Sequence, residues 1–256
     1  MLKRLSTLVS KPAAAAPTTA PGDRVYAIGD VHGRYDLLRR LLDKIERHSA
    51  ALPPAKSTHV IMLGDLIDRG EDSARVLKLA HDVQRRTKNL FVLLGNHEEL
   101  MIRALSGEPG MVGAWMKLGG RATLRSYGIE PPEGDYDLRA FTKQVSDAIP
   151  PHIVTWLKSL PISARSGDYF FCHAGVRPGV PLKKQVANDL LWIRDGFLDS
   201  DVDHGAVIVH GHSIATDVQL RHNRIGIDTG AYRTNVLTGL YLEADQCEIL
   251  TVQADA

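Results

Sequence analysis

Four short stretches of this chain place Asp, Asn or His beside glycine, and these residue types bind metal ions. They read GDVHG (29–33), GDLIDRG (64–70), GNHE (95–98) and HGHS (210–213), and His173 follows a β-rich run. The donors are carboxylate and amide oxygens and imidazole nitrogens, which suit manganese, iron or zinc better than calcium or magnesium alone. The pattern therefore predicts a transition-metal site assembled from distant parts of the sequence.

The number of candidate ligands indicates more than one metal ion. A single tetrahedral zinc takes fewer ligands than this set offers, whereas two metals that share one carboxylate would use them all. Two metals can clamp the attacking and the departing oxygen of a displacement at phosphorus, so the chemistry indicated is hydrolysis of a phosphate ester. The candidate ligands are Asp30, His32, Asp65, Asn96, His173 and His212.

The first three motifs each follow a short apolar run that is typical of a β-strand. The expected strands are residues 24–28, 59–63 and 90–94, and amphipathic helices are expected between them at residues 35–48 and 73–86. Alternating strands and helices predict a largely parallel sheet with right-handed crossovers. Because such sheets bind ligands beyond the carboxyl ends of their strands, each motif lies where a site is expected.

The second half of the chain is expected to complete the site with further strands. These are residues 169–172, 207–209, 225–228, 236–242 and 247–252, of which the last three are expected to be antiparallel. Two sheets packed face to face, with helices outside, would bring the motif-bearing strand ends to one edge. The segment at about 103–160 holds no cluster of metal-ligand residues, and helices are expected there at 138–149 and 151–160. We interpret it as an insertion that caps the site and shapes access for the substrate.

The bulk composition limits the classes of protein to consider. The chain has 256 residues, 44% hydrophobic and 24% charged, with a net charge of +1, so no global charge favours nucleic acid or an anionic membrane. Two cysteines and the lack of an apolar run of ~20 residues favour a reducing, cytoplasmic setting without a membrane span. Residues 1–22 are expected to be a flexible tail and residues 23–256 the catalytic domain, with the oligomeric state left open.

The order GDVHG, GDLIDRG, GNHE, a strand-borne histidine and GHS resembles the calcineurin-like metallophosphoesterase superfamily. Within it, the chain is most similar to the phosphoprotein phosphatase branch that includes bacterial serine/threonine phosphatases. Each motif alone is a weak signal, but four in this order are a strong one. The resemblance implies an α/β fold, a two-sheet β-sandwich flanked by helices in four αββα layers. It also implies two divalent metal ions, for which we expect Mn²⁺, with iron or zinc as alternatives.

The resemblance assigns the metal ligands individually. Asp30 and His32 would bind the first metal, and Asp65 would bridge both metals because its carboxylate has two oxygens. Asn96 would offer its carbonyl oxygen to the second metal, together with His173 and His212. His210 is a rival to His212, but the family's GH[ST] pattern favours His212.

The resemblance also assigns the groups that act on the phosphate. His97 would be the general acid that protonates the departing alkoxide, and the Asp68 carboxylate would raise the pKa of His97. Arg69 and Arg194 would bind phosphate oxygens, because a guanidinium matches them two at a time. Asn96 would contact the phosphate as well as the metal.

The expected reaction is direct in-line attack by a water or hydroxide that bridges the two metals, without a phosphoenzyme. Phosphomonoesters on proteins are the favoured substrates, with phosphoserine, phosphothreonine and phosphotyrosine all open, and small phosphoesters beside them. The alternative is hydrolysis of a symmetrical dinucleoside polyphosphate, such as diadenosine tetraphosphate, or of an RNA cap by the same site. Sequences that resemble the symmetrical diadenosine tetraphosphatases carry alanine where this chain has Asp68, and GNHD instead of GNHE. A catalytically inactive metal-binding module ranks last because no ligand is missing from the sequence.

Overall fold

The computed structural model describes residues 16–134 and 136–254 and contains two mixed five-stranded sheets. The first sheet has the strand order β10-β9-β1-β2-β3, and the second has the order β4-β5-β6-β8-β7. The strands are β1 (Asp23–Ile28), β2 (Ser57–Met62), β3 (Leu90–Val92), β4 (Ser163–Ser166), β5 (Tyr169–Cys172), β6 (Val207–His210), β7 (Gln219–Leu220), β8 (Arg224–Gly226), β9 (Val236–Glu243) and β10 (Gln246–Gln253).

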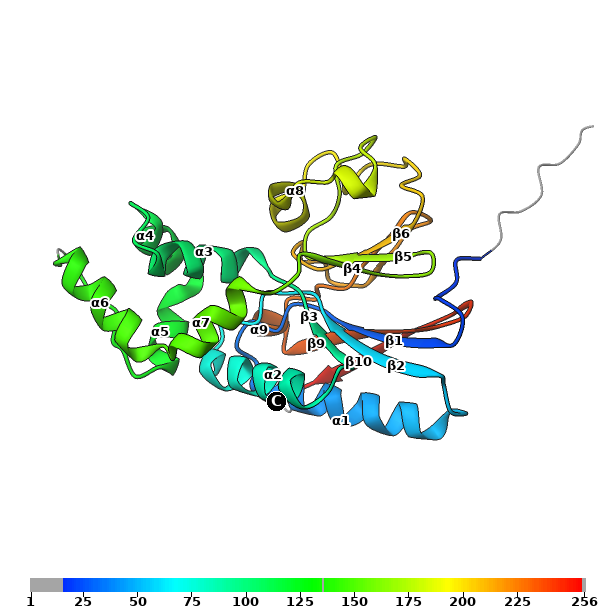
Figure 1. Ribbon diagram of the computed structural model, residues 1–256, viewed down its shortest axis with the longest axis horizontal. Helices are drawn as coiled ribbons and strands as arrows, with labels where there is room; N and C mark the ends of the chain where they lie inside the picture. Colours follow the sequence, from blue (N-terminus) through cyan, green and yellow to red (C-terminus); the bar gives the residue numbers. More distant parts are fainter. Residues whose placement is uncertain (1–15, 135, 255–256) are drawn as a thin grey trace, which may run out of the picture.

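Helices cover the outer faces of both sheets. In Figure 1, α1 and α2 lie below the first sheet, α8 lies above the second, and α4 to α7 extend beyond one end of the sheets. The helices are α1 (Tyr35–Ala51), α2 (Ser73–Arg86), α3 (Asn96–Leu105), α4 (Met111–Trp115), α5 (Arg121–Ser126), α6 (Leu138–Ala148), α7 (Pro151–Lys158), α8 (Ala187–Trp192) and α9 (Ala231–Thr234), with a π-helical segment at Met116–Gly120 and a 3₁₀ turn at Leu182–Lys184.

The alternation of side chains along β1 shows how the layers are built. Tyr26 and Ile28 point toward the helices below the first sheet, whereas Val25 and Ala27 point into the space between the two sheets. Successive strand residues face opposite sides, so a strand that is buried on both faces is apolar throughout. A third cluster, including Phe170 and Leu190, fills the space between the second sheet and α8. The predicted four-layer αββα sandwich is therefore confirmed.

The parallel strands end at the same edge of the molecule. β1 pairs in parallel with β2, and β2 with β3, in the first sheet. In the second sheet β5 pairs in parallel with β6. The loops that follow these five strands therefore lie close together, and they hold the sequence motifs.

Two strand expectations need correction. The strand expected at 225–228 was to be antiparallel, but β8 pairs in parallel with β6 and is antiparallel only to the short strand β7. After β6 the chain runs back along β7 at the edge of the sheet, and the hairpin from β7 to β8 turns it again, so β8 runs in the direction of β6. β4 was not expected at all; it forms a hairpin with β5 across Gly167 and Asp168.

The N-terminal tail expected at 1–22 lies partly outside the described residues, at 1–15. The remainder is hydrogen-bonded to the body of the protein. The Thr18 amide donates to an Asp168 carboxylate oxygen at 2.9 Å, and the Thr19 amide donates to the carbonyl oxygen of Ala244 at 3.0 Å. The Ala20 amide donates to Ser166 Oγ at 3.0 Å. Residues 18–20 thus lie across the ends of both sheets rather than forming a free linker.

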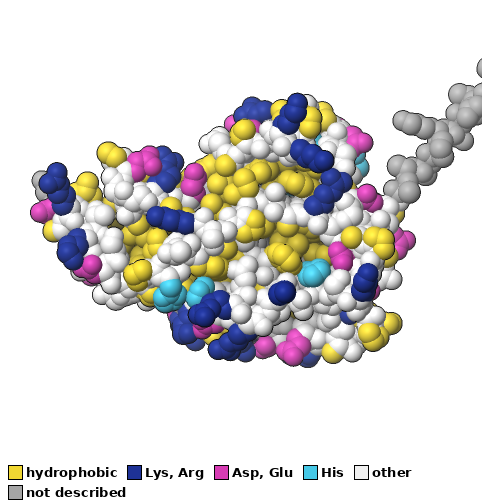
Figure 2. Space-filling view, in the orientation of Figure 1, with side chains coloured by type: hydrophobic (Ala, Val, Ile, Leu, Met, Phe, Trp, Pro, Cys, Tyr) yellow, Lys and Arg dark blue, Asp and Glu magenta, His cyan; other side chains and the backbone are white. Residues whose placement is uncertain are grey.

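The space-filling view shows how polar and apolar groups are distributed on one face. In Figure 2, hydrophobic side chains gather along the middle of this face, and Lys, Arg, Asp and Glu lie mostly toward its rim. No helix among residues 16–134 and 136–254 is both long and apolar enough to cross a bilayer.

Candidate active site

The structure brings all of the predicted ligands together at the carboxyl ends of the parallel strands. Asp30 and His32 follow β1, Asp65 follows β2, Asn96 begins α3 directly after β3, and the two remaining histidines follow β5 and β6. Each of these side chains is buried. Buried charges and imidazoles at one edge of a sheet are costly unless they are paired or bind metal, so the cluster indicates a functional centre.

The backbone around the centre is held in an uncommon conformation. Seven non-glycine residues among those described have positive φ, and five of them belong to the predicted site. A left-handed backbone costs energy for residues with a Cβ, and such residues concentrate at functional sites. The five are His32 (φ 44°), Asp65 (φ 48°), Asp68 (φ 73°), Arg69 (φ 70°) and His212 (φ 62°).

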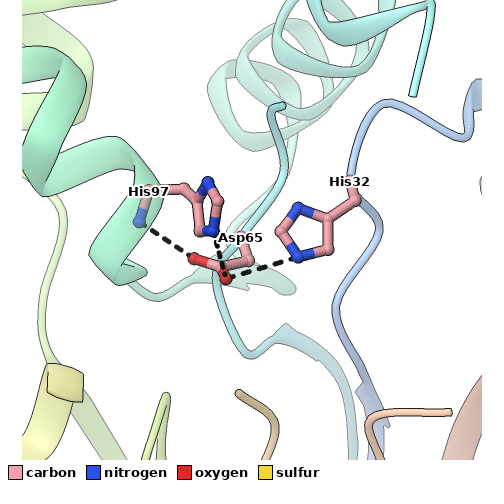
Figure 3. A group of neighbouring side chains, drawn as sticks. All are labelled: His32, Asp65 and His97. Carbon is pink, nitrogen blue, oxygen red and sulfur yellow. Dashed lines mark hydrogen bonds and ion pairs between the residues drawn. The ribbon is translucent and has the colours of Figure 1, made fainter. Parts of the chain in front are cut away.

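Asp65 lies at the centre of the cluster, as Figure 3 shows for its contacts with His32 and His97. Its Oδ2 is 3.5 Å from His32 Nε2 and 3.8 Å from His97 Nε2. Its Oδ1 is 3.3 Å from His173 Nε2 and accepts the His97 amide at 3.1 Å. The two oxygens therefore face different imidazoles, which is the arrangement that a bridging carboxylate needs.

Two groups of side chains could each hold an ion, and Asp65 belongs to both. One consists of His32, Asp65 and His97, and the other of Asp65, His173 and His212; within each group the ligand atoms lie within 4.8 Å of one another. Asn96 joins the second group, because its Oδ1 is 2.7 Å from His173 Nε2 and 3.0 Å from His212 Nδ1. The donors are imidazoles, one carboxylate and one amide, a set that fits a first-row transition metal.

Asp30 lies beside these groups rather than within the first of them. Its Oδ2 accepts the His212 amide at 2.9 Å, which joins the loops after β1 and β6. Its Oδ1 is buried and has no hydrogen-bond partner in the described part of the chain. An unpartnered buried carboxylate oxygen at the edge of a histidine cluster is well suited to a cation. Burial, Asp228 and Asp65 hold the pKa of Asp30 well above its ordinary value, a direction that a bound cation would reverse.

The tautomers of the buried histidines follow from their outer contacts. The Nδ1 atoms of His32 and His173 are 2.8 Å and 3.0 Å from the carbonyl oxygens of Ile67 and Leu63. Because a carbonyl oxygen only accepts, these Nδ1 atoms carry the proton, and the Nε2 lone pairs point to the centre. Burial lowers the pKa of His32 to about 3 and also lowers that of His173, so both rings are neutral and able to bind metal.

His97 differs from these rings because its Nδ1 faces a carboxylate. The distance from His97 Nδ1 to Asp68 Oδ2 is 2.6 Å. Burial lowers the pKa of His97, but Asp65 and Asp68 outweigh burial and the net shift is upward. A proton on both ring nitrogens is what a general acid needs, with Nε2 directed at the reaction centre. The pairing predicted between His97 and Asp68 is therefore present in the structure.

The two predicted phosphate-binding arginines lie on either side of the cluster. Arg69 Nη1 is 3.1 Å from His32 Nε2, and Arg69 Nη2 is 3.1 Å from His97 Nε2. Arg194 Nε donates to His212 Nε2 at 3.0 Å. Each guanidinium thus lies against a ring nitrogen of a candidate ligand.

Glu98, the last residue of the GNHE motif, holds the loop after β2 in place. Its carboxylate accepts four backbone amides: those of Asp65, Leu66 and Ile67 in the loop after β2, and that of Gly95, all between 2.8 and 3.2 Å. Burial raises the pKa of Glu98 to about 8, while the four N–H donors favour the ionised form. Glu98 therefore holds the backbone on which Asp65 and Asp68 are mounted.

His210 and His212 differ in where their rings lie. His210 lies on β6, with Nδ1 3.0 Å from the Gly211 carbonyl oxygen and its ring packed against Phe197. Only His212, beyond the strand end, joins Asp65 and His173. Burial lowers the pKa of His212 to about 2, and its neutral ring faces the centre.

The model of the calcineurin-like phosphoesterase family matches residues 23–237. The chain belongs to that family. The resemblance found from the motifs is thereby confirmed, and the protein is a hydrolase of phosphoesters with a candidate dinuclear metal centre.

Similar proteins bear different names within this family. The asymmetrical bis(5'-nucleosyl)-tetraphosphatase of Oceanobacillus iheyensis is 24% identical over 234 residues, which cover 84% of this chain and 87% of that protein. Serine/threonine-protein phosphatase 2 of Escherichia coli is 28% identical over 216 residues, covering 81% and 87%. The crystal structure of a putative diadenosine tetraphosphatase superimposes with a TM-score of 0.62 at 18% identity, covering 94% of this chain and all of that one. That likeness shows the fold.

Proposed function

We propose that this protein is a metal-dependent phosphomonoesterase that acts on phosphoproteins, at serine or threonine and also at tyrosine. The observation that carries the proposal is the hydrogen bond between His97 and Asp68 beside the candidate metal ligands. An alkoxide from serine or threonine is a poor leaving group and needs a proton, which this pair is arranged to supply.

Each predicted residue has a task in the proposed reaction. Arg69 and Arg194 hold the phosphoryl oxygens and spread the charge that develops on them. His97 donates the Nε2 proton to the departing oxygen, while Asp68 holds the Nδ1 proton and orients the ring. Asn96 would contact both the second metal and the phosphate.

The metals would be held by the predicted ligand set, with Asp65 shared between them. Two divalent ions, of which manganese is the one proposed, supply charge neutralisation and activation of the attacking water when they are bound. The unpartnered Asp30 Oδ1 and the inward Nε2 lone pairs of His32 and His173 support the fit.

A groove beside Arg69 supports a peptide rather than a polyphosphate as substrate. It has a volume of about 400 Å³. Three carboxylates line it, and of its two arginines, Arg34 is bonded to Asp36 at 2.6 Å. The long anionic chain of a dinucleoside tetraphosphate would be repelled there, whereas a peptide with basic residues would not. The lining side chains with charge or an aromatic ring are Arg34, Asp36, Arg69, Glu71, Asp72 and Tyr232.

The second candidate function is hydrolysis of a dinucleoside polyphosphate by the same centre. The name of the Oceanobacillus iheyensis relative, which matches most of this chain, supports it. In that reaction the leaving group is itself a phosphate, so the proton from His97 would matter less.

The test is hydrolysis by metal-stripped protein to which manganese is returned. 4-Nitrophenyl phosphate, phosphothreonine and phosphotyrosine peptides, and diadenosine tetraphosphate are offered in parallel. We expect the peptides to be hydrolysed faster than the dinucleotide. Preference for the dinucleotide would replace the first proposal by the second, and no hydrolysis of any substrate with metal bound would contradict both.

A further inference from the structure

Asp68 is the carboxylate that orients His97, and it is completely buried. A buried carboxylate is stable only when donors satisfy its oxygens. Only one of these donors is His97. The others come from the segment between α3 and β4, which the sequence analysis interpreted as a cap over the site.

Trp115, the last residue of α4, donates its indole N–H to both oxygens of Asp68. The distances from Nε1 are 3.0 Å to Oδ1 and 3.1 Å to Oδ2. The indole is itself buried, with only 1% of the residue exposed. Gly120 packs against its ring so closely that a Cβ would lie 2.7 Å from three ring atoms. This close packing of Gly120 therefore restricts movement of the indole ring.

Thr123 on α5 contacts both the side chain and the backbone of Asp68. Its hydroxyl donates to Oδ1 at 2.5 Å and accepts the Asp68 amide at 2.9 Å. The same insertion holds the next residue, because the Arg69 amide donates to the Gly119 carbonyl oxygen at 3.2 Å. Asp68 and Arg69 both have positive φ, and these bonds offset the cost of that backbone.

We propose that Trp115 and Thr123 are positioning residues for the general acid: they lock the Asp68 carboxylate so that His97 presents its proton to the leaving group. This inference rests on the proposed role of His97. It assigns to the insertion a direct part in proton transfer, in addition to covering the site. With donors on both oxygens, the Asp68 carboxylate cannot rotate away from His97 without breaking at least one other hydrogen bond.

The test compares leaving groups. Trp115→Phe and Thr123→Val remove one donor each, and both should slow hydrolysis of phenyl phosphate roughly tenfold, a part of the about 10²–10⁴-fold that general acid catalysis supplies. Hydrolysis of 4-nitrophenyl phosphate, whose phenolate leaves without a proton, should change little. Thr123→Ser, which keeps the hydroxyl, should restore the wild-type ratio of the two kcat values. Bound manganese and the melting temperature are measured for every variant.

Matched controls exist within the same segment. Trp156→Phe on α7 removes an indole that donates to Gln84 Oε1 at 2.6 Å, and Thr142→Val on α6 removes a hydroxyl bonded to the Leu138 carbonyl oxygen. Neither residue contacts Asp68, so neither variant should change the ratio. If Trp115→Phe does not fold, the comparison of Thr123→Val with Thr123→Ser tests the proposal by itself.

A second measurement does not depend on any substrate. The short hydrogen bond from His97 to Asp68 should give a downfield imidazole N–H signal in the proton NMR spectrum, identified by its loss in His97→Ala. We expect Trp115→Phe and Thr123→Val to shift this signal and Trp156→Phe to leave it unchanged. An unshifted signal in both, or equal slowing of both aryl phosphates, overturns the inference. If His97→Ala itself slows both aryl phosphates equally, the proposed role of His97 is wrong, which is a separate failure.

Discussion

At the scale of single residues, the site depends on two buried carboxylates that each accept several hydrogen bonds. Glu98 gathers four backbone amides, and Asp68 is bound by three side-chain donors. Both carboxylates shape the loop after β2 without lying among the predicted metal ligands. Asp65, Asp68 and Arg69 in this loop have positive φ although they carry a Cβ, and these hydrogen bonds offset the cost of that backbone.

The sequence predicted the residues that face the centre better than the residues that hold them in position. Asp65, His173 and His212 were assigned by motif order, and the structure places them within one group. The contacts of Trp115 and Thr123 with Asp68 were not predicted, because nothing in one sequence tells which tryptophan of an insertion reaches a given carboxylate. For Glu98 a signal was present: a glutamate three residues after Gly95 is the spacing at which a side chain can bond back to a helix N-terminus.

Replacing Asp65 should reduce the amount of metal that the protein binds. Asp65→Asn removes the charge that both candidate groups share, and an amide offers one oxygen in place of two. We expect bound manganese and activity to fall by more than the about 10–100-fold that loss of an outer hydrogen-bonding partner causes. Metal content by mass spectrometry after dialysis checks this. Asp43→Asn, on the exposed face of α1, is the control and should retain its metal.

Replacing Glu98 should weaken the fold rather than the metal contacts alone. Glu98→Gln turns an amide N–H₂ toward two of the backbone N–H groups, so two donors lose their acceptor. The expected loss is roughly 1–3 kcal/mol of the free energy of unfolding. Urea unfolding measures it, and Glu108→Gln, an exposed partner of Arg103, should change stability by no more than about 0.5 kcal/mol. Equal effects of the two substitutions would show that Glu98 does not hold the loop.

At the scale of elements, the long amphipathic helices and buried strands were predictable and the short ones were not. The helices predicted at 35–48 and 73–86 correspond to α1 and α2, and the strand predicted at 236–242 lies within the eight-residue strand β9. Their apolar periodicity extends over enough residues to be distinctive. α4, α5 and the intervening π-helical segment are five or six residues each, and they are held by contacts to Trp115 and Asp68 rather than by local preference.

The helix predicted at 138–149 begins with a side-chain cap that can be tested. The Asp137 carboxylate accepts the amides of Arg139 and Ala140 at 2.8 Å and 3.1 Å. Asp137→Ala leaves both amides without this acceptor and should cost about 0.5–2 kcal/mol. Asp137→Asn keeps an acceptor oxygen and should lose less. Thermal unfolding of the two variants gives the comparison, and equal melting temperatures for Asp137→Ala and the wild type would exclude the cap as a source of stability.

At the scale of the whole molecule, the arrangement of the two sheets followed from the sequence, but the side-chain contacts between distant segments did not. Parallel strands that end in motifs predicted a common edge, because crossovers have one hand. The contacts that join distant segments, such as Arg24 with Glu243, could not be predicted, since any of many charged residues could have paired. Arg24 is buried, and it also donates to the carbonyl oxygens of Ser49 and Pro53 at the end of α1.

The ion pair between Arg24 and Glu243 predicts how stability depends on pH. Arg24 Nε lies 2.6 Å from Glu243 Oε2, and this hydrogen bond lowers the pKa of Glu243. A carboxylate whose pKa is lower in the folded state stabilises the fold above its unfolded-state pKa of about 4.3, and the gain is lost as the pH falls through the folded-state pKa. Glu243→Gln should therefore cost roughly 1–3 kcal/mol at pH 7. The difference from the wild type should shrink as the pH falls below about 4. Urea unfolding across this range checks it against Glu46→Gln on the exposed face of α1, and a difference that stays constant with pH would assign the loss to packing rather than to charge.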